Sequence, residues 1–471
     1  MSRGLIIAAP GSGAGKTTLT LGLLRALSRR GVAVRGAKSG PDYIDPRFHE
    51  AACGRPCPNL DAWAMTPDRI RALARRPPAM ADTAGTAAGT AGTAGTVAGT
   101  AAGTVADTPN GARPPSAPGG LLLIEGAMGL FDGAPPAGKG SSADLARLLN
   151  LPVLLVVDSA RMAQSVAALV EGFARHDPRL RIAGVILNNI GSPRHEALLR
   201  RALAPLGLPV VGALGRLPDL AHPSRHLGLV QAGERADLEA YLERAADAVD
   251  AAVDIAALDA LATALPPAPA APGAPPPPAR LRAPARRIAI ARDRAFAFAY
   301  PHMLEDWRRD GAQLAFFSPL ADEPPPPCDM VFLPGGYPEL HAARLAGAER
   351  FRAGMHAAAA TAQVYGECGG YMVLGRTLTD ARGRAHPMLG LLDLDTSFAR
   401  PRLHLGYRQL VPLGGPFRGT VLGHEFHYAV SLRESGKALF HARDAEGNEL
   451  GTTGLRAGRV CGAFAHVIDG A

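Results

Sequence analysis

Two short motifs in this chain carry side chains that could do chemistry, and the first lies close to the N-terminus. The segment 11–18, GSGAGKTT, follows an apolar run and precedes a stretch with helical spacing. Glycines let backbone N–H groups converge on phosphate oxygens, and the helix adds the positive end of its dipole. Lys16 would reach the outer phosphates, and Thr17 would coordinate Mg²⁺. Although Pro10 replaces the first glycine of the strict motif, the context predicts a nucleotide site formed by Gly11, Gly13, Gly15, Lys16, Thr17 and Thr18.

A magnesium ion at this loop needs a second ligand at the end of a neighbouring strand. Glu125 closes the apolar run LLLIE, and Asp158 closes LPVLLVVD. A hard cation prefers carboxylate oxygen, so either residue is suitable. Glu125 is the favoured candidate and Asp158 the competitor, while a strand-end acid that caps a helix is the alternative for both.

Two polar loops could position a substrate. The segment 38–50, KSGPDYIDPRFHE, holds Asp42, Tyr43 and Asp45, which could hold a metal ion or a substrate or could cap a helix. The segment 130–149 places Ser141 and Asp144 before a helical stretch. These two residues could bind an anionic substrate at a helix N-terminus, or they could form the cap of that helix.

The second motif is G-x-C-x-G at residues 366–370, GECGG, between an apolar run and a helical stretch. It is the thiol form of a nucleophile elbow, in which a sharp turn presents Cys368 at a helix N-terminus and stabilises its thiolate. The Gly369 N–H would face a developing oxyanion, and Gly336 in the LPGGYPE loop could supply a second donor. The alternative is a buried cysteine in a glycine-rich turn.

A nucleophilic thiol requires a base, and the second half of the chain offers several histidines. The candidates are His386, His424, His427 and His466. The HEFH segment does not have the spacing of a zinc motif. Spacing alone therefore does not select the base.

These motifs need sheets that bring them to strand ends, and the apolar runs predict two such sheets. Short apolar runs alternate with helical stretches in both halves, which is typical of α/β domains with mostly parallel sheets. The predicted strands are residues 5–9, 32–38, 121–127, 151–158, 182–189, 287–293, 312–319, 329–336 and 363–370. We expect an N-terminal P-loop-type domain (1–250), a Pro/Ala-rich linker (251–286) and a C-terminal domain (287–471). An Ala/Gly/Thr-rich tract within 82–118 is interpreted as a surface insertion.

Composition excludes several other classes of protein. No apolar run is long enough to span a bilayer, and the N-terminus is interpreted as a strand and not as a signal peptide. Five cysteines in 471 residues favour a reducing, cytoplasmic compartment, and the pair Cys53 and Cys57 lacks further zinc ligands. The net charge of +8 reflects arginine spread along the chain, so we expect no nucleic-acid partner. The assembly is left open, with a homodimer as one possibility.

Several motifs together indicate a family. The glycine loop, GPDYIDP, EGAMGLFDG, LPGGYPE, GECGGYM, LGYR, GHEFHYA and AHVID occur in one order along the chain. In this the sequence resembles the cobyrinic acid a,c-diamide synthase family, including its cobalt-free branch, which acts on hydrogenobyrinic acid. The resemblance covers nearly the whole chain except the two low-complexity segments, and TSFARPRLHLGYR looks more like the cobalt-free branch.

The resemblance implies two linked reactions. The C-terminal domain would be a class I glutamine amidotransferase in which Cys368 attacks glutamine and His466 is the base. The usual superfamily glutamate two residues later is replaced by Ile468, which implies a Cys–His dyad and leaves the role of Asp469 open. Ammonia would pass internally to the first domain. There, ATP–Mg²⁺ would phosphorylate the c and then the a acetate of the corrin, with Lys16, Thr17 and Glu125 at the nucleotide and Asp42 and Asp45 in the substrate and metal loop.

Other functions remain as alternatives to this ligase. Cobyric acid synthases share both domains but typically differ where GPDYIDP stands here. A partitioning-type ATPase would usually carry a second lysine early in the loop, where Ser12 and Gly13 stand. A stand-alone thiol hydrolase would have no use for the phosphate loop.

Overall fold

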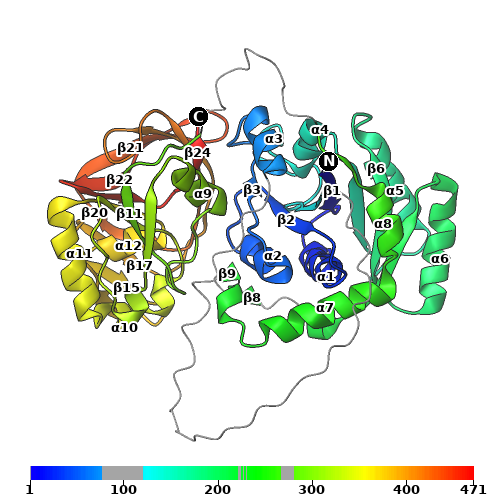
Figure 1. Cartoon of the computed structure of the whole chain (residues 1–471), viewed down its shortest axis with the longest axis horizontal. Coiled ribbons are helices and arrows are strands. Elements are labelled where there is room, and N and C mark those ends of the chain that lie inside the picture. The colour runs from blue at the N-terminus through cyan, green and yellow to red at the C-terminus, as the bar shows by residue number, and fades with distance from the viewer. Residues whose placement is uncertain (1, 77–119, 221–223, 226–227, 230, 267–279) are drawn as a thin grey trace, which may run out of the picture.

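The computed structural model describes residues 2–76, 120–220, 224–225, 228–229, 231–266 and 280–471. The predicted insertion at 82–118 and part of the predicted linker lie outside these ranges. Two units, each built on its own large sheet, lie side by side (Figure 1). None of the helices in the described ranges combines the length and apolar character needed to cross a membrane.

The described part of the first unit contains an eight-stranded sheet with the order β3-β2-β4-β1-β5-β6-β7 and with β10 paired to β1. Every pairing along this order is parallel. Its strands are β1 (Arg3–Ala8), β2 (Val34–Ser39), β3 (Asn59–Leu60), β4 (Leu121–Glu125), β5 (Val153–Asp158), β6 (Ile182–Ile190), β7 (Val210–Gly215) and β10 (Thr263–Ala264). The five apolar runs predicted as strands in this half are all strands of the sheet.

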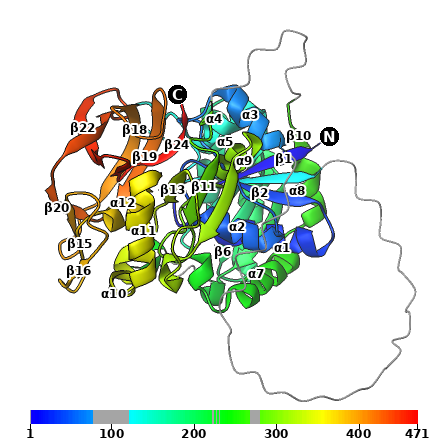
Figure 2. The ribbon, with the colours of Figure 1, turned by 60° about the vertical axis from the view of Figure 1, so that its left-hand side comes forward.

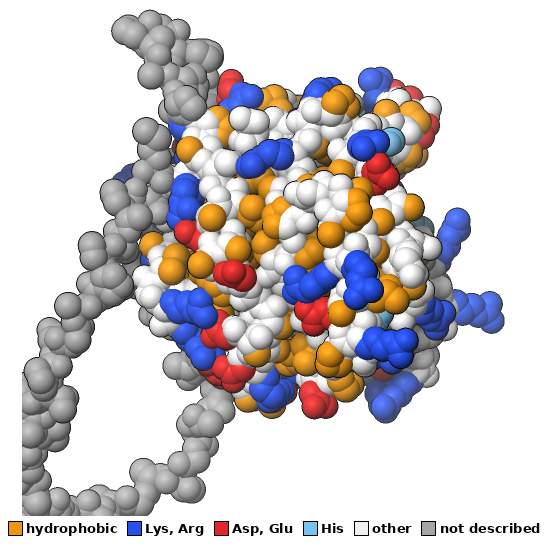
Figure 3. Space-filling view, turned by 90° about the vertical axis from the view of Figure 1, so that its right-hand side faces the viewer, with side chains coloured by type: hydrophobic (Ala, Val, Ile, Leu, Met, Phe, Trp, Pro, Cys, Tyr) orange, Lys and Arg blue, Asp and Glu red, His pale blue; other side chains and the backbone are white. Residues whose placement is uncertain are grey.

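Helices cover both faces of this sheet, which is why its central strands are almost wholly apolar and buried. The helices are α1 (Lys16–Arg29), α2 (Asp45–Cys53), α3 (Pro67–Arg75), α4 (Ser142–Leu149), α5 (Ser165–His176), α6 (Pro193–Leu203), α7 (Leu238–Ala252) and α8 (Ile255–Leu261). Helices α1, α2 and α7 lie together in both views (Figures 1 and 2). The face drawn in Figure 3 mixes basic, acidic and apolar side chains.

The first unit extends beyond the boundary predicted at residue 250. Asp254 caps α8 through the N–H of Ala257, and β10 pairs with the start of β1. Arg3 also forms an ion pair with Asp259 at 2.9 Å. Residues 255–264 therefore belong to the first unit, as helix α8 and strand β10, and precede the Pro/Ala-rich stretch.

The described part of the second unit contains a ten-stranded sheet with the order β12-β11-β13-β14-β23-β22-β21-β18-β19-β24. The first five strands in this order are parallel, and the others are antiparallel. The strands are β11 (Arg287–Ala291), β12 (Gln313–Phe317), β13 (Met330–Leu333), β14 (Gln363–Glu367), β18 (His404–Pro412), β19 (Val421–His427), β21 (Lys437–Arg443), β22 (Glu449–Ala457), β23 (Val460–Ala463) and β24 (His466–Gly470). The prediction of a mostly parallel sheet fails for the residues from β18 onward, where mostly antiparallel strands follow one another without helices between them.

Shorter elements complete the second unit. A small sheet contains β15 (Thr377–Thr379), β16 (Ala385–Pro387), β17 (Leu394–Ser397) and β20 (Val430–Glu434). The helices are α9 (Pro301–Arg309), α10 (Ala342–Ala346), α11 (Glu349–Thr361) and α12 (Gly369–Leu374). Short helix α12 follows β14 directly, which places the cysteine motif at the carboxyl end of a central parallel strand.

A buried ion-pair network joins the two units. Arg69 on α3 donates from Nε to Asp469 on β24 at 2.7 Å and from a terminal nitrogen to Asp306 on α9. All three side chains are almost fully buried. Asp469 also accepts the backbone N–H of Leu281. The network therefore accounts for Asp469, whose role the sequence left open, as an interface residue.

Replacing Arg69 by alanine should strongly destabilise this interface. Asp469 and Asp306 would stay buried after losing a counter-charge, so we expect the free energy of unfolding to fall by about 3–5 kcal/mol. Chemical denaturation measures the change. Arg71 on the same helix is the control, because its pair with Asp68 is partly exposed and should be worth less than about 1 kcal/mol. Equal effects of Arg69→Ala and Arg71→Ala would contradict the prediction.

Candidate active site

The glycine loop between β1 and α1 has the backbone geometry that its sequence demands. Gly13 and Gly15 have φ values of 79° and 88°, in the left-handed region. A side chain at Gly15 would also collide with Asn188, whose Nδ2 would lie 2.2 Å from the added Cβ. Lys16 donates from Nζ to the carbonyls of Gly11 (3.0 Å) and Met128 (2.6 Å). Lys16 therefore already contacts the loop at which a phosphate would bind.

A cluster of buried charged groups adjoins this loop. Lys38 and Glu125 are register partners on β2 and β4, and Lys38 Nζ contacts Glu125 Oε1 at 2.7 Å and Asp45 Oδ2 at 2.6 Å. Thr17 donates from Oγ1 to the same Glu125 oxygen at 2.7 Å, and His49 Nε2 contacts the other oxygen at 2.6 Å. Neither Lys38 nor His49 was among the predicted site residues, although both lie in the segment 38–50.

The charges in this cluster hold one another ionised. Burial raises the pKa of Glu125, but the charge of Lys38 and the contact with His49 outweigh it and hold that pKa well below its usual range. Burial likewise lowers the pKa of Lys38, but Asp45 and Glu125 raise it well above the ordinary value. The hydroxyl of Thr17 and the carboxylates of Glu125 and Asp45 converge here, which is the oxygen-rich donor set that Mg²⁺ prefers.

The two strand-end acids that compete in the sequence have different surroundings. Glu125 contacts Thr17, whereas Asp158 accepts the N–H of Ala160 and the side-chain amide of Asn189. These contacts of Asp158 are those of a local turn. The geometry therefore favours Glu125 as the carboxylate beside the loop.

The segment that follows β2 holds Asp42, Tyr43 and Asp45 in three different environments. Asp42 accepts the N–H groups of Ile44 and Asp45, as in an Asx turn, and so shapes the chain that leads into α2. Burial and the charge of Asp45 raise the pKa of Asp42 to about 7. Asp45 reaches the charged cluster and lies 3.5 Å from Thr17 Oγ1. Tyr43 instead turns toward the second unit.

The other polar residues named as candidates form local structure. Ser141 and Asp144 make a reciprocal capping box at the start of α4, which corresponds to the alternative that the sequence left open. Thr18 contacts the carbonyl of Leu220 from its hydroxyl. Cys53 and Cys57 are buried free thiols, and Cys57 Sγ lies 3.3 Å from His49 Nδ1.

Cys368 lies at a strained turn between β14 and α12. Its φ of 46° and ψ of −105° are unusual for a residue with a side chain. A Cβ at Gly370 would lie 1.9 Å from the carbonyl oxygen of Leu333, so the turn tolerates only glycine there. The geometry is that of an elbow which presents one side chain above the sheet.

The sequence predicts a stabilised thiolate at Cys368, whereas the structure favours the neutral thiol. Burial and the negative charge of Glu339 raise the pKa of Cys368, and the N–H of Gly369 lowers it by less. The cause is the nearly complete enclosure of the side chain, which favours its neutral form. Cys368 therefore needs a base to remove its proton.

His466 at the start of β24 lies beside this thiol. A Cβ built on Gly335 would lie 2.3 Å from Cε1 of His466, 3.0 Å from its Nε2 and 3.3 Å from Cβ of Cys368, so both residues border the same small space. Burial lowers the pKa of His466 to about 3, which keeps the ring neutral and able to accept a proton. Of the histidines left open by the sequence, His466 is the one that this contact favours.

Backbone N–H groups lie close to the same space. A Cβ on Gly369 would lie 3.0 Å from the backbone nitrogen of Gly336, and one on Gly336 would collide with the carbonyl of Ala295 at 2.0 Å. The two glycines proposed as oxyanion donors are therefore in close backbone contact. Close approach is available only because neither has a side chain.

A small cavity above Cys368 is closed by a residue from the first unit. The ring of Tyr43 stacks on His466 with centroids 4.6 Å apart and on Phe298 at 4.3 Å. Its hydroxyl donates to the carbonyl of Phe426 at 3.4 Å. The cavity measures about 30 Å³, which is room for a water molecule or two.

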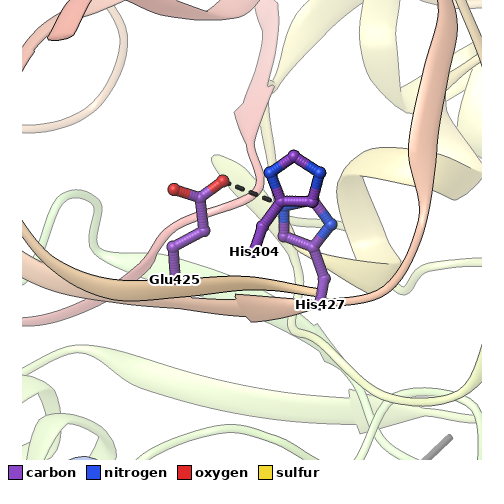
Figure 4. Close-up of side chains that lie close together, drawn as sticks. All are labelled: His404, Glu425 and His427. Carbon is purple, nitrogen blue, oxygen red and sulfur yellow. Dashed lines mark hydrogen bonds and ion pairs between the residues drawn. The ribbon is translucent and has the colours of Figure 1, made fainter. Parts of the chain in front are cut away.

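The other histidines considered as the base make different contacts. His386 pairs with Asp380, and the register of β19 sets His424 beside His466. Figure 4 shows a third group, in which the ring of His427 stacks on that of His404 and contacts Glu425. These three residues form the metal-like cluster found in the described ranges.

The cluster in Figure 4 fits a charged hydrogen-bonded group better than a metal site. The guanidinium of Arg408 lies 2.7 Å from Glu425 and already supplies a positive charge. The rings of His404 and His427 are parallel within 3°, so their nitrogen lone pairs lie in separate planes and do not converge on one ion. Although burial raises the pKa of Glu425, the hydrogen bond from His427 and the charge of Arg408 hold it at about 2.

Comparisons with known proteins agree with this division into two sites. Residues 5–230 match the domain family described as CobQ/CobB/MinD/ParA nucleotide binding domain, and residues 287–470 match the CobB/CobQ-like glutamine amidotransferase domain. Among curated relatives, hydrogenobyrinate a,c-diamide synthase of Brucella abortus biovar 1 is 56% identical over 99% of this chain and 98% of its own length. The proteins of the same name from Rhodobacter capsulatus (52%) and Rhizobium meliloti (50%) match over 99% of both chains.

Substituting Gly335 by alanine tests the geometry around the thiol. The added methyl group would displace the His466 ring, so we expect alkylation of Cys368 by iodoacetamide to slow by about tenfold or more, as part of a general-base contribution of about 10²–10⁴ is lost. The mass of the Cys368 peptide over time measures the rate. The control is Gly347→Ala, where an added Cβ meets its nearest atom at an ordinary 3.6 Å. An unchanged rate in Gly335→Ala would count against His466 as the base.

Proposed function

The chain belongs to the hydrogenobyrinate a,c-diamide synthase family, and we propose roles for its residues in an ATP- and glutamine-dependent amidation of the a and c acetate carboxylates of the cobalt-free corrin. Glutamine-dependent amidation in cobalamin biosynthesis is the activity of this family, and it replaces the partitioning-type and hydrolase alternatives. The cobalt-free substrate is proposed because the relatives carry that name. A homodimer stays a prediction.

In the first unit, the proposed reaction is phosphoryl transfer to a corrin carboxylate. The carboxylate oxygen attacks the γ-phosphorus of ATP, ADP leaves, and an acyl phosphate forms. Ammonia then attacks the acyl carbon, and inorganic phosphate leaves with the formation of the amide. The N–H groups of residues 11–15 and the ammonium of Lys16 would stabilise the charge on the transferred phosphoryl group.

Thr17, Glu125 and Asp45 would hold the Mg²⁺ that accompanies ATP, and that ion would supply positive charge to the phosphate oxygens. The donor set fits, since it consists of one hydroxyl and two carboxylates. Lys38 is the resident counter-ion between the two acids. Its ammonium lowers the pKa of Glu125 and so favours the ionised carboxylate before the nucleotide arrives.

In the second unit, the proposed reaction is hydrolysis of the glutamine amide. Nε2 of His466 would take the thiol proton of Cys368 as its sulfur attacks the amide carbon, and would return the proton to the departing nitrogen, which leaves as ammonia. The N–H groups of Gly369 and Gly336 would stabilise the oxyanion. Water then hydrolyses the thioester to glutamate.

The observation that carries this assignment is that one short loop touches both sites. Asp45 lies 3.5 Å from Thr17 in the nucleotide region, and Tyr43, two residues earlier, stacks on His466 in the thiol site. Ammonia released beside Cys368 would therefore have only the span of this loop to cross. That proximity supports internal transfer of ammonia between the units.

The Cys368→Ala variant tests the two-site function. With ATP–Mg²⁺ and hydrogenobyrinic acid, we expect the wild type to add two amides from either glutamine or ammonium. The variant should add two amides from ammonium alone, because the first unit is intact. Product mass distinguishes the cases. A wild type that amidates neither hydrogenobyrinic nor cobyrinic acid would contradict the proposed substrate.

The Glu125→Gln variant tests the carboxylate cluster. Loss of the charge beside Thr17 should lower the amidation rate with both nitrogen donors by about 100-fold or more, since each charged group at a phosphoryl-transfer site is worth several kcal/mol. Product formation as a function of the Mg²⁺ concentration gives the rate and the metal dependence, and thermal unfolding checks the fold. Asp158→Asn is the matched control and should stay within about twofold of the wild type. The reverse ranking would reassign the metal ligand to Asp158.

A further inference from the structure

His466, the proposed base of the thiol site, has no hydrogen-bond partner among the described residues to orient its ring, as a catalytic histidine usually has. The side chain of His466 is fully buried, yet neither ring nitrogen has a hydrogen-bond partner among the described residues. The position two residues later is Ile468, whose side chain offers no acceptor. A base of this kind normally needs a third group that fixes its tautomer.

A carboxylate from a different element stands next to this ring. Glu367 is the last residue of β14 and directly precedes Cys368. Its Oε1 accepts the N–H of Val467 and the hydroxyl of Tyr365, each at 3.1 Å. Its Oε2 has no hydrogen-bond partner in the described ranges and lies 3.9 Å from Nδ1 of His466. Both side chains are at most 1% exposed.

We propose that Glu367 is the positioning carboxylate of His466, which reaches the ring from the nucleophile strand. Oε2 accepts the Nδ1–H of His466, so that the lone pair of Nε2 is free for the proton of Cys368. When the ring takes that proton, the same carboxylate stabilises the imidazolium. The proposal rests on the roles proposed above for Cys368 and His466. Catalytic hydrogen bonds are often long in the free enzyme, and a small rotation of either side chain shortens this one.

A purely structural role accounts for only one of the two carboxylate oxygens of Glu367, namely Oε1. The bonds to Oε1 tether β24 to β14, and an uncharged glutamine could make them equally well. Oε2 has no such bond, although leaving a buried polar atom unpaired is costly. A glutamine would place an N–H₂ donor against Nδ1, and the ring would then carry its proton on Nε2, where it cannot act as a base.

The surroundings of the pair give it a pH dependence. Burial raises the pKa of Glu367 to about 8, against smaller opposing effects of the Val467 N–H and Tyr365. The protonated acid can only donate to Nδ1, so the active form is the ionised one, and its population rises as the pH rises through that value. The groups that face Glu367 and His466 are Tyr365 on β14, the Val467 N–H on β24, His424, Glu425 and His427 on β19, Cys368, and Tyr43 from the first unit.

The test compares Glu367→Gln with Glu434→Gln, a carboxyl of the same unit that also accepts a tyrosine hydroxyl but faces Tyr371. For Glu367→Gln we expect kcat with glutamine to fall by about 100-fold or more, while KM for glutamine and the rate with ammonium stay within about twofold. The rise of the glutamine-dependent rate with pH should disappear. Glu367→Asp should recover part of the rate, because it restores a carboxylate. The Glu434→Gln control should behave like the wild type.

The outcomes separate this proposal from the proposed function. If Cys368→Ala loses glutamine use and Glu367→Gln keeps it within about threefold, Glu367 is not the positioning group and the two-site function stands. An equal loss with ammonium would assign Glu367 to the fold and would also overturn the proposal. If Cys368→Ala still uses glutamine, the proposed function itself fails.

A second variant keeps the carboxylate and changes only its ionisation. Tyr365→Phe removes the hydroxyl that donates to Oε1 and stabilises the charged form. We expect the pH inflection of the glutamine-dependent rate to move upward, with the ammonium-dependent rate unchanged. An inflection that does not move would contradict the proposal even if Glu367→Gln fails to fold.

Discussion

The clamping of strand β24 between the two units is the constraint on which both sites depend. His466 begins this strand and stacks on Tyr43, and Asp469, three residues later, is bound by Arg69. Tyr43 and Arg69 both belong to the first unit. The proposed base of the amidotransferase is therefore held from the neighbouring unit at both ends of a five-residue strand, so its position depends on the docking of the two units.

The two sites use burial in opposite ways. Around Glu125 and Lys38, opposite charges lie within 2.7 Å and remain ionised, because each partner compensates the desolvation of the other. Around Cys368 and His466, among the described residues, burial is the largest effect on the pKa of each group and favours the neutral form of both. The first site is therefore charged before substrate arrives, whereas the second becomes charged only when a proton moves.

The sequence predicted the elements of these sites better than their partners. Each predicted apolar run became a strand, and the glycine loop and the cysteine turn lie at strand ends, because glycine and apolar patterning act locally. Contacts between distant segments were not visible in the sequence. Lys38 meets Glu125 only through the register of β2 and β4, and Tyr43 meets His466 only through the docking of two units.

Asp469 and Glu367 also show that contacts between distant segments could not be predicted from the sequence. The sequence left the role of Asp469 open, and in the structure this residue binds Arg69 across the interface. Alternation along β24 accounts for this, since residues an odd number apart point to opposite faces of a strand. The carboxylate that lies next to His466 is that of Glu367 on β14, about 100 residues earlier in the chain. The pairing of β14 with β23, and the short connection from β23 to β24, bring the two residues together.

The small cavity above Cys368 links these observations to the working of the enzyme. The space of about 30 Å³ has room for a water molecule or two in the resting structure, and Tyr43 and Cys368 both line it. Tyr43 is a wall supplied by the first unit, and its loop also carries Asp45 beside the nucleotide site. Under the proposed function, a ligand that displaced this loop would change the affinity for glutamine, and glutamine would change the affinity for that ligand by the same factor. The loop that carries Tyr43 and Asp45 would therefore, under the proposed function, couple the binding of glutamine to the binding of the nucleotide.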